Sequence, residues 1–362
     1  MKITDVKVTV ITAETPFGGP PGRSFANLVQ VFTDQGIEGD YLAGGGRSSG
    51  RGLAETIVNS VKPMIVGRDP LDREAIWHNL VDRGANMGGI SMNAVGAIDV
   101  CLWDIGGKAA GVPVYKLLGG YRDRVRAYAS LIQHDSPKEY ADYCVELQKR
   151  GYTAAKLHLR GGPESNLVDC RTVREAVGPT FTLMLDVNCR YDRREALWIG
   201  RELEKINYFW YEEPLVNTDI DGYKELCRQL DIPVAATETL YYANPQHFVP
   251  YLKEPVADIL RTDAERGITL AKKVSDLCDA FNVKCELHGW GCACCQFANL
   301  QVAGACRNSD FFEKMEPGEL YDACVKDTVQ IDKEGYVHLP TKPGLGVELD
   351  FAEIKKRTVF ST

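Results

Sequence analysis

From residue 125 onward, short apolar runs alternate with longer amphipathic segments. Apolar runs of about five residues bounded by turn residues are typical of buried strands, and amphipathic periodicity is typical of helices. The expected strands are 125–131, 154–159, 181–187, 208–211, 233–237, 258–261, 283–287 and 311–314. The expected helices are 137–150, 163–176, 193–206, 223–230, 245–252 and 269–281. Because no hairpin signal interrupts this alternation, we predict an α/β fold, a (β/α)8 TIM barrel with a truncated last helix.

Residues 1–124 follow a different pattern, which predicts a separate α+β domain. Apolar residues alternate at the start, and further strands are expected at 27–33 and 37–41 around a turn, so the three form an antiparallel meander. Helical periodicity follows at 53–66, 72–81 and 91–110. Beyond the barrel segment, 125–320, residues 321–362 return to hairpin-like sequence. We expect this last segment to fold back onto the N-terminal domain.

Composition and charge are those of an ordinary globular protein. The chain has 362 residues, of which 44% are hydrophobic and 25% charged. A net charge of −8 without a dense basic run argues against a nucleic-acid partner. No apolar stretch reaches the roughly 18 residues that a membrane span needs, so no membrane partner is expected. The first residues lack the apolar core of a signal peptide, and we therefore expect the protein in the cytoplasm.

Twelve cysteines raise the question of disulfides or zinc. In this setting we expect reduced thiols. The cluster Cys292, Cys294 and Cys295 lacks the paired Cys-x-x-Cys spacing of structural zinc sites, and it opens an apolar, helix-like run at 292–305. Small buried core residues are the favoured interpretation.

Three acids recur at an even spacing along the predicted barrel. Asp186, Glu212 and Glu238 lie 26 residues apart (212 − 186 and 238 − 212), and each directly follows an apolar run. A strand, helix and return loop take roughly 25–30 residues. The spacing therefore places three carboxylates at the C-terminal ends of three successive parallel strands, where barrels carry their catalytic groups.

Three converging carboxylates repel each other unless a cation neutralises them. Mg²⁺ favours carboxylate and water oxygens in octahedral geometry and leaves positions open for a substrate. The alternative is that these are ordinary strand-end acids, solvated or paired with Lys and Arg. That explanation suits any one of them, but the shared spacing favours a metal site.

Other ionisable residues are expected at the same barrel mouth. Lys156 and His158 are two apart on one strand, so both side chains face the same way, where the lysine suits a substrate carboxylate and the histidine suits proton transfer. His288 ends the seventh strand, and Asp263, one strand away, is placed to hold it in one tautomer. Glu313, near the end of the eighth strand, is a candidate donor to a developing oxyanion.

The motifs around these residues resemble those of the enolase superfamily, specifically its mandelate racemase-like subgroup, over almost the whole chain. The runs 97–104 and 116–120 resemble the joint between its capping domain and its barrel. By this resemblance Glu213 is a neighbour of a metal ligand and not a ligand itself. The remaining matches are Asp186, Glu212 and Glu238 as Mg²⁺ ligands, Asp263 and His288 as a dyad, and Glu313 as the acid that hydrogen-bonds the enolate.

The resemblance also implies where the substrate is recognised. Asn188 matches a position that helps to bind metal or substrate carboxylate, and the Gly- and Pro-rich loop containing Phe17 and Arg23 matches the lid that selects the substrate. From the residues alone this loop is equally consistent with a disordered connection. Arg160 and Arg23 suit a polyhydroxylated or diacid substrate.

One departure bears on the reaction. Many members carry Lys-x-Lys on the second strand, whereas this chain has Lys156-Leu157-His158. His158 then serves either as the base on one face of the substrate or as a binding group beside a single base, His288. This departure favours dehydration over racemisation.

The resemblance implies Mg²⁺-dependent removal of the proton α to a carboxylate through an enediolate. The favoured reaction is dehydration of an aldonate or aldarate to a 2-keto-3-deoxy acid. One alternative is a racemase or epimerase of a 2-hydroxy or amino acid derivative, with His158 and His288 on opposite faces. Another is a non-catalytic binding protein, against which the complete ligand set argues. The resemblance also implies a homo-oligomer, from dimer to octamer.

Overall fold

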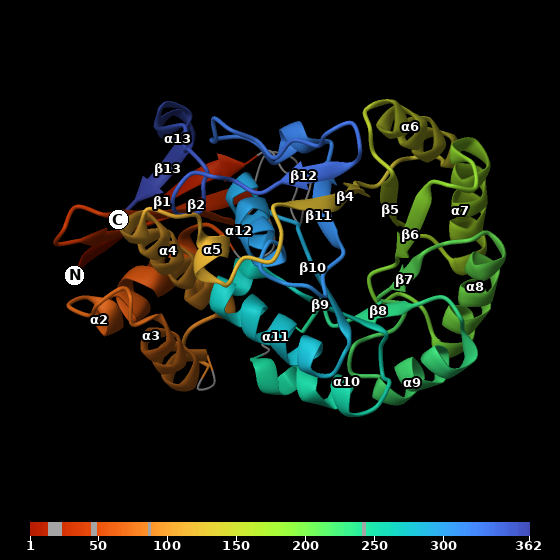
Figure 1. Cartoon of the computed structure of the whole chain (residues 1–362), viewed down its shortest axis with the longest axis horizontal. Coiled ribbons are helices and arrows are strands. Elements are labelled where there is room, and N and C mark those ends of the chain that lie inside the picture. The colour runs from red at the N-terminus through yellow and green to blue at the C-terminus, as the bar shows by residue number, and fades with distance from the viewer. Residues whose placement is uncertain (14–23, 45–48, 86–87, 241–243) are drawn as a thin grey trace.

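The computed structural model of the chain describes residues 1–13, 24–44, 49–85, 88–240 and 244–362. It contains a barrel surrounded by helices and, beside it, a smaller domain built on a second sheet (Figure 1). The predicted lid, with Phe17 and Arg23, lies outside the described residues. Among the described helices, none is both long and apolar enough to cross a membrane.

Eight parallel strands form the nearly closed barrel, which confirms the predicted fold. Neighbouring strands pair in the order β10-β9-β8-β7-β6-β5-β4-β11. Their bounds are β4 Arg124–Leu131, β5 Ala154–His158, β6 Thr182–Asp186, β7 Trp210–Glu212, β8 Val234–Ala236, β9 Ile259–Thr262, β10 Lys284–Leu287 and β11 Phe311–Glu316.

No ladder joins β10 to β11 within the described ranges. The buried Glu286 carboxylate lies at this join and accepts hydrogen bonds from Asp310 N at 2.8 Å, Phe311 N at 3.1 Å and Ser309 Oγ at 3.2 Å. A side chain therefore takes the amides that strand pairing would otherwise use.

Helices cover the outside of the barrel, and Figure 1 shows α6 to α9 as an arc around β5 to β8. Sequence signals set their starts: Pro137 follows the Ser136 cap of α6, and Asp192 and Glu195 form a capping box on α8. The segment predicted as a helix at 245–252 is instead a 3₁₀ turn, η3, followed by the short α10. The bounds are α6 Pro137–Lys149, α7 Pro163–Val177, α8 Arg193–Lys205, α9 Ile220–Gln229, η3 Pro245–Phe248, α10 Val249–Lys253, η4 Ala264–Arg266, α11 Ile268–Ala280, α12 Ala293–Ala303 and η5 Gly318–Leu320.

The smaller domain is an antiparallel sheet with helices, in the strand order β13-β1-β2-β3. Alternating residues such as Val6, Val8 and Val10 are buried on one face of β1, as its sequence pattern predicts. The bounds are β1 Ile3–Ala13, β2 Ser24–Thr33, β3 Glu38–Gly44, α1 Arg51–Thr56, η1 Ile57–Val61, α2 Lys62–Ile65, α3 Arg73–Leu80, η2 Val81–Ala85, α4 Met92–Ala110, α5 Val114–Leu117, α13 Phe351–Arg357 and β13 Thr358–Ser361.

The segment after β11, which was expected to fold back onto the N-terminal domain, contacts both domains. The strand β12, Tyr336–His338, pairs antiparallel with β4 of the barrel. Only later does the chain reach the smaller sheet, where β13 pairs with β1.

Helix α4 docks the smaller domain against the barrel. A Cβ at Gly96 would lie 2.4 Å from Glu265 O, so only glycine allows α4 to approach η4 this closely. Three residues along, the buried Asp99 accepts hydrogen bonds from Thr269 N at 2.8 Å and Thr269 Oγ1 at 2.6 Å. Burial raises the pKa of Asp99 to about 6. The close approach of Gly96 to η4 and the Asp99–Thr269 hydrogen bonds together hold the segment that directly follows Asp263.

Candidate active site

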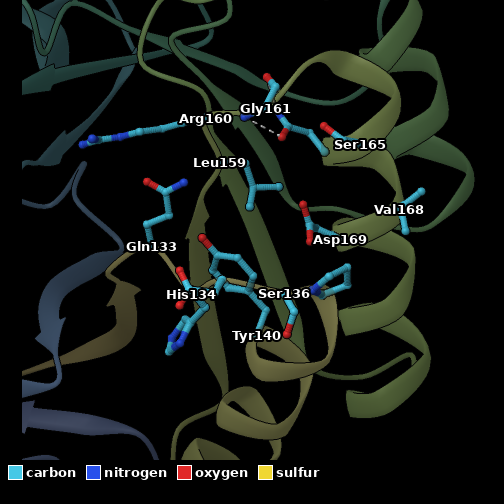
Figure 2. A pocket seen from close by; sticks show the side chains of 13 residues that line it. Gln133, His134, Ser136, Tyr140, Leu159, Arg160, Gly161, Ser165, Val168 and Asp169 are labelled. Carbon is cyan, nitrogen blue, oxygen red and sulfur yellow. Dashed lines mark hydrogen bonds between the residues drawn. The ribbon is translucent and has the colours of Figure 1, made fainter.

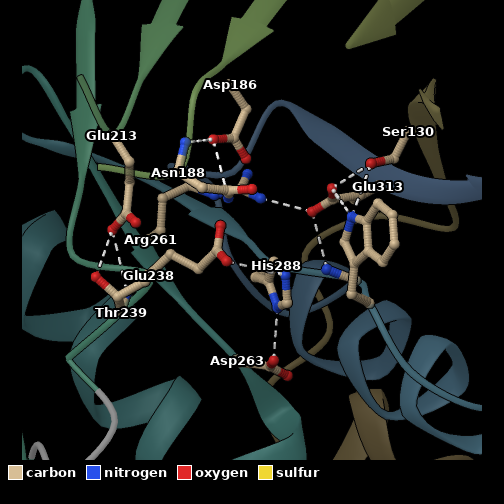
Figure 3. A network of polar contacts seen from close by, with 12 residues as sticks. Ser130, Asp186, Asn188, Glu213, Glu238, Thr239, Arg261, Asp263, His288 and Glu313 are labelled. Atoms are coloured by element: carbon tan, nitrogen blue, oxygen red, sulfur yellow. Dashed lines mark hydrogen bonds and ion pairs between the residues drawn. The ribbon is translucent and has the colours of Figure 1, made fainter. Parts of the chain in front are cut away.

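The three evenly spaced acids converge at the C-terminal end of the barrel, and Figure 3 shows two of them, Asp186 and Glu238. Asp186 and Glu212 are the last residues of β6 and β7 and lie side by side in register, and Glu238 lies two residues beyond β8. One oxygen from each lies within 4.8 Å of the other two. All three side chains are buried.

These acids satisfy the requirements of a divalent-cation site. Asp186 Oδ2, Glu212 Oε1 and Glu238 Oε2 are buried, and none accepts a hydrogen bond of acceptable geometry from any described residue. Two of them have a close neighbour of another kind, since Arg261 Nε lies 2.9 Å from Glu212 Oε1 and His158 Nε2 lies 3.1 Å from Asp186 Oδ2. Three buried carboxylates this close together are costly unless a cation binds them. Hard oxygens at one point are the donor set that Mg²⁺ prefers.

A layer of buried aromatic side chains forms the floor beneath these acids. Tyr128, Trp210 and Phe311 are buried together inside the barrel, with the Tyr128 and Trp210 rings edge to face at 5.4 Å between centroids. Lys156 Nζ lies 5.5 Å from the centroid of the Tyr128 ring, and the Arg261 guanidinium lies 5.9 Å from that of Trp210. The aromatic faces therefore support the two cations.

Four charged side chains above this floor form a closed ring of alternating sign. Lys156 Nζ lies 2.8 Å from Glu212 Oε2 and 3.0 Å from Glu313 Oε1. Arg261 closes the ring, with Nε 2.9 Å from Glu212 Oε1 and Nη2 2.5 Å from Glu313 Oε2. All four are fully buried or nearly so. Burial opposes the charge on Lys156 and Arg261, but the two glutamates outweigh it and hold both pKa values well above their usual range.

Glu313 is saturated with donors in this ring. Besides the two cations, Ser130 Oγ donates to it at 2.6 Å, Gly289 N at 2.9 Å and Trp290 Nε1 at 3.1 Å. Burial would raise the pKa of Glu313, but Lys156 and Arg261 hold it well below its usual range. The expected role as a donor to an oxyanion therefore does not fit this arrangement, because Glu313 carries no proton and accepts on both oxygens.

His288 is held in one tautomer by Asp263. Its Nδ1 lies 2.7 Å from Asp263 Oδ2, so Nδ1 carries the proton and Nε2 faces Glu238 Oε1 at 3.3 Å. The other Asp263 oxygen accepts from Glu265 N at 2.6 Å and Asn299 Nδ2 at 3.2 Å. Burial alone would lower the pKa of His288, but Glu238 and Asp263 raise it to about 9.

His158 is oriented in the same way from the other side. Its Nδ1 lies 2.9 Å from the carbonyl of Leu131, which can only accept, so Nε2 is the atom that faces Asp186 Oδ2 at 3.1 Å. The ring packs edge to face against Trp290, with 4.8 Å between centroids. The site therefore holds two imidazoles whose Nδ1–H groups are anchored and whose Nε2 atoms both point at the acid cluster.

The residues expected to bind substrate are placed unevenly. Asn188 contacts the cluster, with its backbone N 2.8 Å and its Nδ2 3.2 Å from Asp186 Oδ1. Arg160 is exposed and lines a separate pocket of about 390 Å³ between the β4–α6 and β5–α7 loops, together with Gln133, Tyr140 and Asp169 (Figure 2). Within the described ranges its guanidinium makes no hydrogen bond or ion pair, so its expected role stays a prediction.

Comparisons with known proteins agree with this geometry. Residues 139–354 match the enolase C-terminal domain-like family, and residues 7–119 match the N-terminal domain of mandelate racemase / muconate lactonizing enzyme. The chain belongs to the mandelate racemase / muconate lactonizing enzyme family. The resemblance drawn from its motifs is thereby confirmed.

Several proteins similar to this chain are named for reactions of sugar acids or of a sugar-acid lactone. A D-xylonate dehydratase from Haloferax volcanii is 29% identical, with 99% of this chain and 89% of the relative covered. A D-galactarolactone cycloisomerase from Agrobacterium fabrum is 29% identical, with 97% of each chain covered. The crystal structure of D-glucarate dehydratase from Agrobacterium tumefaciens complexed with magnesium is 33% identical, with a TM-score of 0.88 and 99% of this chain and 100% of that chain covered.

Three site residues of this family member were not expected from sequence. Arg261 completes the charged ring, Trp290 packs against His158, and Asn299 supports Asp263. The sequence could have predicted a role for Arg261, because a charged residue inside an apolar strand needs charged partners or a function at the site. The cysteines at 292–295 are buried and free, as expected, and in the described chain the acid triad is the only group arranged to hold a metal ion.

Proposed function

We propose that this protein is a Mg²⁺-dependent dehydratase that converts an aldonic or aldaric acid to a 2-keto-3-deoxy acid. The observation that carries the proposal is the pair of Nε2 atoms, of His158 and His288, directed at a cluster of three buried carboxylates. The dehydratase names of relatives that match nearly the full chain support the choice of acid sugars.

The residues divide the reaction among themselves. Bound to Asp186, Glu212 and Glu238, Mg²⁺ would supply positive charge that holds a carboxylate and stabilises the enediolate. An imidazole Nε2, of His158 or His288, removes the proton from C2, and the C–H electrons move into the enediolate. Protonated Nε2 of His288 then gives its proton to the C3 hydroxyl, which leaves as water. The resulting enol tautomerises to the 2-keto-3-deoxy acid.

A screen of the Mg²⁺-loaded enzyme against aldonic and aldaric acids, with detection of 2-keto-3-deoxy products, tests this proposal. We expect at least one acid to be converted and conversion to stop when EDTA removes the metal. Failure with every member of a library covering the stereoisomers would contradict dehydration of acid sugars.

A racemase or epimerase is the second candidate, because the two Nε2 atoms approach the same cluster from different strands. The cycloisomerase among the relatives shows that an isomerase is compatible with this degree of similarity. Running the same screen in D₂O separates the two. Deuterium at C2 of recovered substrate without loss of water would replace dehydration by epimerisation.

Affinity for Mg²⁺ is expected to rise with pH between about 7 and 9. Despite burial, Glu238 and Asp263 raise the pKa of His288 to about 9 without metal, so this imidazole holds a second proton in neutral solution. A cation bound to the neighbouring carboxylates favours neutral His288, so the proton competes with it and is released on binding. Calorimetry in two buffers of different ionisation enthalpy measures this release. Equal heats in both buffers and a flat affinity would contradict it.

We also propose that the protein works in the cytoplasm and assembles into a homo-oligomer, from dimer to octamer, with a small carboxylate as its only other partner. The family resemblance supports the assembly, and the negative net charge supports the absence of a nucleic-acid partner. Light scattering on the purified full chain would test the oligomeric state. A monomer at all concentrations would contradict this expectation.

A further inference from the structure

Backbone strain surrounds all three metal-ligand candidates. Asn188 and Cys189, just after Asp186, have φ of 46° and 61°. Glu213, directly after Glu212, has φ of 44°, and Thr237, directly before Glu238, has φ of 83°. Non-glycine residues rarely adopt this left-handed conformation, and they keep it only where the surroundings enforce it. Some contact must therefore hold the three strand-end turns.

One buried carboxylate contacts two of these turns directly. Glu213 Oε1 accepts from Asn217 Nδ2 at 2.6 Å, Thr239 N at 3.0 Å and Thr239 Oγ1 at 3.2 Å. Its Oε2 accepts from Cys189 Sγ at 3.1 Å. Cys189 follows β6 and Thr239 follows β8, while Glu213 itself follows β7, so one side chain joins the turns of all three ligand strands. Figure 3 shows the part of this linkage between Glu213 and Thr239.

Asn217 extends this linkage to the most strained residue. Its Oδ1 accepts from Thr237 N at 2.8 Å, while its Nδ2 donates to Glu213. The backbone adds a further bond from Cys189 N to Glu213 O at 2.7 Å. We call Glu213, Asn217, Cys189 and Thr239 the strand-end clamp. None of its four side chains belongs to the acid cluster itself.

We propose that Glu213 is a positioning residue that sets the affinity for the divalent cation, by holding the turns that aim Asp186, Glu212 and Glu238. The inference rests on the proposed metal-dependent function. A carboxylate has about four acceptor sites, and among the described residues the side-chain oxygens of Glu213 accept hydrogen bonds from the other three members of the clamp. Without these acceptors the left-handed turns lose their support, and the three oxygens lose their fixed spacing before metal binds. Residues that support metal ligands in this way typically change metal affinity 10- to 100-fold.

The test is Mg²⁺ binding by calorimetry to the purified, metal-free full chain, with thermal stability measured in parallel. Glu213→Met keeps the length of the side chain but removes every acceptor, and we expect Mg²⁺ affinity to fall by about 10- to 100-fold. Glu213→Gln keeps one carbonyl oxygen and is expected to recover part of the loss. Should Glu213→Met fail to fold, Glu213→Gln and the next variant carry the test.

Two further variants separate positioning from other causes. Asn217→Leu breaks the clamp without changing any charge, and it should also weaken Mg²⁺ binding. Glu286→Met removes a buried glutamate that accepts three hydrogen bonds at the join of β10 and β11, away from the ligand strands. It should lower thermal stability but leave Mg²⁺ affinity within about threefold, because the three donors to Glu286 lie at 309–311 and not in the turns of the ligand strands.

If wild type binds Mg²⁺ and Glu213→Met binds it with unchanged affinity, this inference is overturned while the proposed function stands. Weak binding by Glu213→Met with normal binding by Asn217→Leu would assign the effect to charge, and would also overturn it. Wild type that binds no Mg²⁺ would overturn both this inference and the proposed function. Loss in both clamp variants, but not in Glu286→Met, would support it.

Discussion

His288→Asn is expected to lower kcat for dehydration by about 10²–10⁴-fold, the range of general acid–base catalysis, with little change in KM. Asparagine can still donate to Asp263 in place of His288 Nδ1, so the loop after β10 keeps its anchor. What disappears is Nε2, the atom that protonates the leaving hydroxyl. Steady-state kinetics on the substrate found by the acid-sugar screen would measure the loss.

The same variant also assigns the base. If His158 removes the C2 proton, His288→Asn should still exchange that proton with D₂O while dehydration stops, and His158→Asn should lose both. His338→Asn is the matched control, because His338 forms a histidine–aspartate pair with Asp332 at 2.8 Å on the surface. We expect it to behave as wild type. A kcat within threefold of wild type for His288→Asn would remove His288 from the mechanism.

Arg261→Met is expected to destabilise the metal-free protein by about 3–5 kcal/mol, the range for removing one partner of a buried ion pair. The ring of Lys156, Glu212, Arg261 and Glu313 has no net charge, and the substitution leaves it with one uncompensated anion above the buried aromatic layer. Urea unfolding followed by circular dichroism would measure the change in the free energy of unfolding.

A double substitution tests whether charge balance is the cause. Arg261→Met with Glu313→Gln removes one cation and one anion, so the remaining Lys156–Glu212 pair is again neutral. We expect the double variant to be more stable than the sum of the two single losses predicts, because the two residues are coupled. Simple additivity of the two losses would show that packing against Trp210, rather than charge, accounts for the effect of Arg261.

Much of the fold was predictable because each barrel strand is a short apolar run bounded by turn residues, and this pattern can be recognised in the sequence. All eight strands lie within a few residues of their predicted bounds. Asp186 and Glu212 could be placed together because parallel strands end at one edge, so residues that end successive strands must be neighbours. The pattern fails where the backbone is irregular: the helix expected at 245–252 contains prolines at both 245 and 250 and becomes a 3₁₀ turn and one short helix.

The rest of the site depends on side chains that meet from distant loops. Asn217 and Thr239 lie in turns without periodicity, and their contact with Glu213 follows from left-handed residues that sequence patterns do not specify. The role of hydrogen-bond donor was assigned to Glu313 from its position at the end of a predicted strand. The five groups that donate to it come from other parts of the chain, and the sequence pattern does not show that they meet there. Arg261 could have been found by the reasoning applied to Lys156, since both interrupt an apolar strand.

The pairing of β4 with β11 has a consequence for synthesis of the chain. Arg126 lies opposite Phe311, and the two residues are 185 positions apart in the sequence (311 − 126). This edge of β4, the first barrel strand, can therefore pair only after β11, the eighth, has been synthesised. During translation the β4 edge therefore stays open while six further strands, β5 to β10, and seven α-helices, α6 to α12, are synthesised. Such open edges associate with other chains. Slow, chaperone-assisted folding is the expected result, and yield from a cell-free ribosome system should rise when chaperones are added.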